Sequence, residues 1–417
     1  MKKMLSYLPN PNSFPLQRSA SRLCRLCRLC LSIAALSGAP ASAAPGDALH
    51  VYAGLGYGHD DNLLRVPDGF PAFDNRLGDS WYQADAGLLF DHTYSRQRIK
   101  GHAKLSRVKF SHFKQLDYDN HDVEATWNWQ LGNRFSGKLG GVYEQSLASY
   151  TDLRSDQRNL RRQRSTFFDG GWRLHPSYRL RAGASTDKFS YDLAAQRAND
   201  RTEDAYEAGA DYLPASGNEI GLVLRKVKGK YPNRRSVGQQ LINDDYDQDE
   251  FKARVLWIAG GSTTVQALGG WVKRRQRSLG DDTSGFNGRI SAAYKRSGAF
   301  SYNAALWRDF APIESTVLNY TLNKGASVGV AWDVSAKVKV DASAVYERRA
   351  YNARLLAIPG DDLKDTIRSA NLRATWQARQ SVQVSATLAH QARSGSVFVG
   401  SGNIKSTSLM LNVNAQF

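Results

Sequence analysis

The chain has 417 residues and only three cysteines, Cys24, Cys27 and Cys30. Their C-x-x-C-x-x-C spacing would suit an iron–sulfur or zinc site, but a fourth ligand is missing. All three lie in a segment that we expect to be removed, so the mature chain would hold together without disulfides. Long apolar runs are also missing. No stretch approaches roughly 18 uninterrupted apolar residues, which excludes a helical membrane protein.

Residues 1–43 predict a secretory signal peptide. A basic region precedes an apolar core at about residues 29–39, and Ala41-Ser42-Ala43 forms an A-x-A cleavage site. We expect cleavage near Ala43 and one mature domain, residues 44–417. The full chain has a net charge of +17, and loss of this basic leader would lower the charge to about +11.

Apolar and polar residues alternate along most of the mature chain. Residues 123–131 read VEATWNWQL, with apolar side chains at the odd positions and polar ones at the even positions. This period of two is typical of strands with two different faces. We mark 18 such strands, beginning near residues 48, 80, 97, 121, 134, 164, 177, 203, 218, 249, 262, 284, 299, 323, 335, 366, 380 and 404.

The connections between these segments alternate between short turns and long polar loops. Short periplasmic turns and long extracellular loops are typical of an outer-membrane barrel. The sequence therefore predicts an all-β, transmembrane, antiparallel up-and-down β-barrel of about 18 strands, with 16 as the alternative, in a Gram-negative outer membrane. Because lipid leaves open strand edges unsatisfied, the last strand must pair with the first. We expect the terminal Phe417 to be the assembly signal read by the barrel-assembly machinery.

If the apolar face meets lipid, the polar face lines a lumen. Basic residues slightly outnumber acidic ones on that face, which favours anions or acidic polymers. The alternative is that these charges pair across strands, as in many barrels. The predicted pore-lining residues are Lys104, Arg181, Arg225, Lys252, Arg254, Arg289, Lys339 and Arg373.

Several predicted long loops are strongly basic. We expect them to bind the phosphates of lipopolysaccharide, with capture of an acidic glycan as the alternative. Nucleic acid is not an expected partner at a cell surface. The predicted extracellular basic residues are Arg154, Arg158, Arg161, Arg162, Arg234, Arg235, Arg274 and Arg275.

The stretch GHDDNLLR follows the first strand. Asp60, Asp61 and Asn62 have oxygen ligands suited to a hard cation such as calcium. An acid/base cluster is a second reading, and a simple turn is a third that we prefer. No nucleophile with a nearby partner is evident, so we expect neither catalysis nor a cofactor.

From Tyr57 to Arg65 the chain reads YGHDDNLLR. With the amphipathic strands and the terminal Phe417, this stretch resembles the β-barrel porin family, and within it the EpsL-type proteins of exopolysaccharide operons. That resemblance implies polysaccharide export, with the polymer and periplasmic export components as partners. Two alternatives stay open: a general or anion-selective porin for small solutes, and a surface barrel that transports nothing. In a porin, an inserted loop narrows the lumen, and the loop at residues 229–248 or the loop at 347–364 is the candidate for this role.

Overall fold

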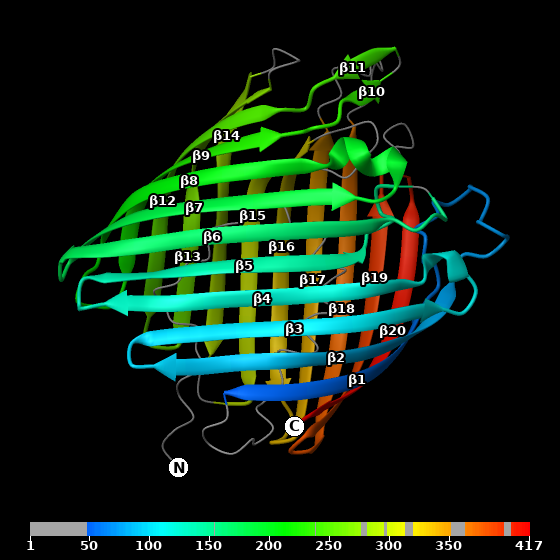
Figure 1. Ribbon diagram of the computed structural model, residues 1–417, viewed down its shortest axis with the longest axis horizontal. Coiled ribbons are helices and arrows are strands. Elements are labelled where there is room, and N and C mark those ends of the chain that lie inside the picture. The colour runs from blue at the N-terminus through cyan, green and yellow to red at the C-terminus, as the bar shows by residue number, and fades with distance from the viewer. Residues whose placement is uncertain are drawn as a thin grey trace.

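The computed structural model describes residues 48–417 except 154, 238, 277–281, 296–297, 313–319, 352–362 and 396–401. The predicted signal peptide lies outside the described residues. Eighteen of the described strands form one antiparallel sheet that closes into a barrel (Figure 1). A separate two-stranded hairpin extends from the rim. Among the described helices, none is long and apolar enough to cross a membrane.

The barrel strands follow one another in chain order around the wall. The first nine are β1 (Leu49–Asp60), β2 (Asp79–Tyr94), β3 (Gln97–Phe110), β4 (Tyr118–Leu131), β5 (Phe135–Leu147), β6 (Leu160–His175), β7 (Tyr178–Tyr191), β8 (Arg201–Tyr212) and β9 (Glu219–Lys230). The other nine are β12 (Tyr246–Ala259), β13 (Thr263–Gln276), β14 (Asp282–Lys295), β15 (Phe300–Pro312), β16 (Tyr320–Asp333), β17 (Val338–Tyr351), β18 (Lys364–Arg379), β19 (Val382–Ser394) and β20 (Ile404–Gln416). The rim hairpin is β10 (Arg235–Val237) with β11 (Gln240–Ile242), and two short 3-10 helices are η1 (Lys114–Leu116) and η2 (Ala194–Asn199).

The first and last strands close the barrel. Tyr52 to Asp60 of β1 pairs with Ser408 to Gln416 of β20. Beyond this ladder, Val51 and Phe417 exchange two backbone hydrogen bonds of 3.0 and 2.8 Å. The prediction of 18 strands is confirmed, and the alternative of 16 is wrong. Every predicted strand start lies within four residues of an observed one.

The outer surface of the barrel carries the apolar face of each strand. Leu411 and Val413 of β20 are 45 % and 47 % exposed, whereas Asn412 between them is 5 % exposed. Near the short turns, the outward aromatic rings stack across neighbouring strands. Phe135 lies 5.8 Å from Trp172, and Phe300 lies 5.6 Å from Trp332, between ring centroids. An apolar band edged by aromatic rings is the surface expected of a barrel that sits in lipid.

The strands extend further toward the long loops than the alternation predicts. Arg161 and Arg162 belong to β6, and Arg274 and Arg275 belong to β13, so their placement in loops is wrong. Arg235 lies in β10 of the rim hairpin and is 2 % exposed. These strand ends extend beyond the apolar layer of the membrane, so polar side chains occupy both of their faces. The alternation of apolar and polar residues is therefore lost there. Arg161 and Arg274 face inward and are 1 % and 2 % exposed.

A pair of neighbouring substitutions tests which face meets lipid. Ala125 points outward between Gly101 and Gly141, so an arginine side chain would fit there sterically. We expect Ala125→Arg to cost about 2–4 kcal/mol of unfolding free energy, because it places a charge in the lipid layer. Thr126→Arg points into the lumen and should cost less than about 1 kcal/mol. Urea unfolding of the barrel refolded into phospholipid vesicles measures both, and equal costs would contradict the assignment of faces.

Candidate functional site

The loop between β5 and β6, of which the structure describes residues 148–153 and 155–159, folds into the barrel rather than away from it. Its Tyr150 is 5 % exposed and belongs to an apolar cluster at the loop end of the lumen. That cluster also contains Trp81 of β2, Phe110 of β3 and Leu64 of the first loop. Phe113 and Leu116, between β3 and β4, belong to it as well, so three loops and two strands are packed together. This packing fixes where the loop begins its path across the lumen.

Asp152 anchors this loop to a distant part of the wall. Its carboxylate lies 2.9 Å from Arg393 of β19 and 3.5 Å from Arg349 of β17. Arg393 also donates to the backbone carbonyl of Thr151. Strands β17 and β19 are not neighbours of β5 or β6 in the sheet. The loop therefore spans the lumen, and we call this contact the Asp152 anchor.

Each arginine of the Asp152 anchor also pairs with a second acidic residue, which lies on its own or a neighbouring strand. Arg349 Nε lies 3.0 Å from Glu347, and Arg393 pairs with Asp365 of β18. The hydroxyl of Tyr351 accepts a hydrogen bond of 3.0 Å from Arg393. Buried charges of this kind are stable only when paired and hydrogen-bonded. Burial alone would raise the pKa of the Asp152 carboxyl, but Arg393 and Arg349 outweigh burial and hold this pKa below its usual value.

The stretch after β1 forms a hydrogen-bonded turn. Asp60 accepts from the backbone of Asn62 at 2.9 Å and pairs with Arg65 at 2.9 Å. The side chain of Asn62 donates to the carbonyls of Val66 and Lys405, at 2.9 and 3.0 Å. Asp61 accepts from the backbone of Thr407 at 2.7 Å. The suggested calcium ligands thus tie the first loop to β20, and the described residues contain no cluster of acidic, histidine or cysteine side chains that could hold a metal.

The lumen wall from β6 to β13 is rich in charges that pair with each other. Arg179 of β7 bridges Asp211 and Glu219, both at 2.8 Å, and Arg254 of β12 also pairs with Asp211. Glu250 holds Lys252 at 2.6 Å and Arg225 at 3.6 Å. The inner face therefore carries short mixed-charge ladders, the alternative that the sequence left open.

Most predicted pore-lining cations belong to such pairs. Arg181 lies 2.6 Å from Asp169, Lys104 lies 3.4 Å from Asp85, and Lys339 lies 3.2 Å from Asp341. Arg289 is held 5.1 Å above the ring centroid of Trp307, and Arg373 lies opposite Asp341 in the strand register. Of the other basic residues, Arg158 and Arg234 lie in loops, whereas Arg154 is outside the described residues.

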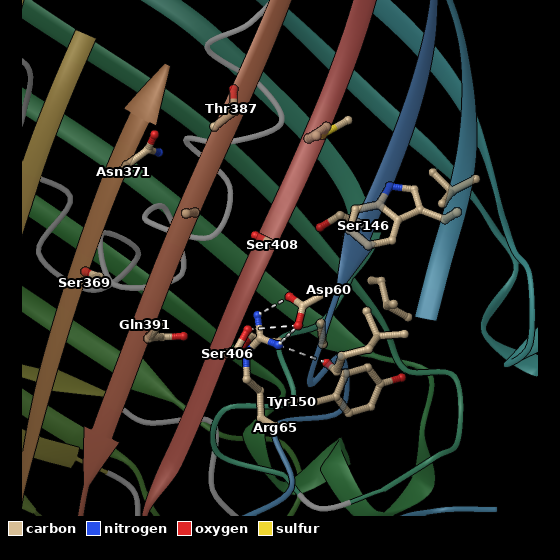
Figure 2. A pocket seen from close by; sticks show the side chains of 18 of the residues that line it. Asp60, Arg65, Ser146, Tyr150, Ser369, Asn371, Thr387, Gln391, Ser406 and Ser408 are labelled. Atoms are coloured by element: carbon tan, nitrogen blue, oxygen red, sulfur yellow. Dashed lines mark hydrogen bonds and ion pairs between the residues drawn. The ribbon is translucent and has the colours of Figure 1, made fainter. Parts of the chain in front are cut away.

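A cavity opens beside the loop between two unlike walls (Figure 2). One wall presents neutral hydroxyl and amide groups from four adjacent strands, β17 to β20. Figure 2 shows Asn371, Gln391 and Ser406 on three of these strands, opposite Tyr150 and Ser146. We call this surface the neutral wall; it consists of Ser343, Ser369, Asn371, Thr387, Gln391, Ser406 and Ser408.

The sequence did not identify the Asp152 anchor. It offered residues 229–248 or 347–364 as the loop that narrows the lumen. The first of these instead carries the hairpin β10–β11, and residues 352–362 of the second lie outside the described residues. Asp152 and Arg349 are 197 positions apart, so no local pattern signals their contact.

The lowered pKa of Asp152 predicts how the anchor responds to acid. A carboxylate with a depressed pKa stabilises the folded state above its unfolded pKa of about 3.9, and loses this effect as pH falls through the folded value. We therefore expect amides of residues 148–159 to stay protected at pH 4.5 and to lose protection at more acidic pH. Asp152→Asn should exchange about 5–150-fold faster already at pH 7, because the arginines lose their shared carboxylate. Hydrogen exchange with mass spectrometry measures this, and equal protection of the loop in both proteins would refute the anchor.

No family model and no curated protein matches this chain. Solved structures of similar shape include the outer membrane protein opdK from Pseudomonas aeruginosa, with a TM-score of 0.48 and 13 % identity over 88 % of this chain and 99 % of that one. Pseudomonas aeruginosa OccK9 (OpdG) has a TM-score of 0.48 and 14 % sequence identity, over 88 % of this chain and 98 % of that one. The FrpB iron transporter from Neisseria meningitidis has a TM-score of 0.46 and 10 % sequence identity, over 88 % of this chain and 82 % of that one. At these identities and TM-scores the likeness says nothing about a substrate.

Proposed function

We propose that this protein is an outer-membrane channel through which small hydrophilic solutes diffuse. The observation that carries the proposal is the Asp152 anchor, which holds residues 148–159 across the lumen. An 18-stranded barrel without such a loop would enclose a wide aqueous channel. With the loop in place, passage is confined to the space beside it, and the size of that space selects small solutes.

The outer surface supports the location in the outer membrane. The exposed apolar band needs lipid, because in water it would form a very large apolar patch. Exposed basic side chains such as Lys228 and Lys230 of β9 point outward at the loop end of the band, where phosphates of lipopolysaccharide would lie. Assembly machinery that reads the strand ending at Phe417 is a further proposed partner.

Export of a polysaccharide, which the resemblance to EpsL-type proteins implies, is the second candidate. A polymer would need a continuous path, and the anchored loop stands across it. The paired cations also weaken the case for guidance of an acidic chain, because a neighbouring carboxylate cancels much of the field of each guanidinium. Opening of the loop by an export partner would be required.

Conductance of the refolded barrel in a planar bilayer separates these candidates. We expect steady single-channel currents from the native protein, and a larger conductance from Asp152→Asn because the loop is released. Asp68→Asn is the matched control, since Asp68 is an exposed aspartate of the first loop. It should leave the conductance unchanged. A silent native barrel that opens only as Asp152→Asn would favour gated export, and silence of both would contradict the channel.

A further inference from the structure

The neutral wall differs from the rest of the lumen in chemistry. Its side chains are arranged as a grid, since Ser408, Ala389 and Asn371 form one cross-strand row and Ser406, Gln391 and Ser369 form the next. Neighbouring strands are about 4.8 Å apart, and alternate residues of one strand about 6.8 Å apart. Hydroxyl and amide groups both donate and accept hydrogen bonds. The wall thus offers closely spaced, uncharged hydrogen-bonding groups of both kinds.

Part of this hydrogen-bonding capacity is unused within the described protein. The side-chain oxygen Oε1 of Gln391 is buried at the cavity and has no hydrogen-bond partner. Two further residues of the same face, Ser385 and Asn412, pair in register below the cavity and also have unpartnered buried atoms, Oγ and Nδ2. Buried polar groups are nearly always satisfied, by protein, water or ligand. Ser385 and Asn412 lie outside the cavity, so at the cavity itself it is Oε1 of Gln391 that points to a polar occupant.

Carboxylates outnumber cations among the charged side chains that line the cavity: Asp60, Asp122 and Glu144 against Arg65. Asp60 is paired with Arg65 at 2.9 Å, and Asp122 lies 3.1 Å from His102. Both pairs involve residues that border the cavity opposite or beside the neutral wall. An anionic solute would lose its hydration there and would meet these carboxylates without gaining an opposite net charge. A neutral solute has no such penalty.

Aromatic side chains complete the lining. Trp81, Tyr118 and Tyr150 all border the cavity. Flat apolar rings combined with a few placed polar groups are typical of sites that bind small organic molecules. A molecule that carries hydroxyls around its rim and apolar C–H faces would satisfy both kinds of surface at once.

We propose that this cavity is a binding site for a neutral polyhydroxylated solute, such as a short uncharged sugar, with Gln391 as a principal hydrogen-bonding residue. The proposal rests on the channel function proposed above and names the class of solute that the channel selects. It assigns selectivity to the neutral wall of β17 to β20 rather than to the predicted pore-lining basic residues.

Maltotriose is a suitable probe, with a trimer of galacturonic acid as the anionic comparison of equal ring number. We expect maltotriose to block the single-channel current in a concentration-dependent manner, and the acidic trimer to block it much less. Gln391→Leu should weaken the block about fivefold, the loss expected for one hydrogen bond. Calorimetry on the detergent-refolded barrel should give the same ratio for the dissociation constant.

The matched control lies on the same strand. Gln383 is also an inward glutamine of β19, outside the cavity, with its amide 3.5 Å from Gln377. Gln383→Leu should leave the maltotriose block unchanged. Equal weakening in both variants, or a stronger block by the acidic trimer, would overturn the proposal. The barrel could conduct no current and yet bind maltotriose in calorimetry, with the binding lost in Gln391→Leu. That result would support the binding site and refute the channel function.

Discussion

Backbone hydrogen bonding is the constraint on which this structure depends. In lipid every backbone amide and carbonyl needs a partner within the protein, and a sheet meets this demand only by closing. Here the seam is the pairing of β1 with β20. The inner face of β1 carries glycine where neighbouring side chains cross it. A Cβ atom at Gly58 would lie 2.2 Å from the ring of Trp81, and one at Gly56 would lie 2.6 Å from Oδ1 of Asn412. The seam therefore makes room for Trp81, which belongs to the same apolar cluster as the loop residue Tyr150.

Closure also explains what the sequence could and could not predict. A wall with lipid outside and water inside imposes a period of two on every strand, and this local signal located all 18 of them. The signal fades where the wall rises above the lipid, which is why the pattern predicts loops at Arg161 and Arg274 although both lie in strands, β6 and β13. The path of residues 148–159 depends on contacts with Arg349 and Arg393, far along the chain. Such contacts follow from the three-dimensional arrangement and leave no periodic trace.

The charges of the lumen show the same difference between what a local pattern predicts and what depends on the fold. The alternation predicts that residues such as Arg225 and Arg254 point inward. It does not predict which carboxylates they pair with, because this depends on which strands become neighbours and in what register. Arg254 meets Asp211 of β8 from β12, across the intervening β9. In the weakly screened interior of a wall, pairs of this kind cancel much of each other's field at distances beyond the pair. A count of basic and acidic residues therefore overstates how strongly the lumen attracts anions.

The arginines of the Asp152 anchor lie on β17 and β19, two of the four strands that form the neutral wall. Arg349 lies beyond Ser343 on the inner face of β17, and Arg393 is the next inward residue after Gln391 on β19. The charges that hold the loop therefore lie at the edge of the neutral wall that is nearest to the long loops. The loop contributes Ser149 and Tyr150 to the cavity. Release of Asp152 would thus remove one side of the cavity as well as widen the lumen. The carboxylate of Asp152 therefore couples selection by size to selection by chemistry. By linkage, if the anchored loop strengthens solute binding, the bound solute stabilises the anchored loop by the same free energy.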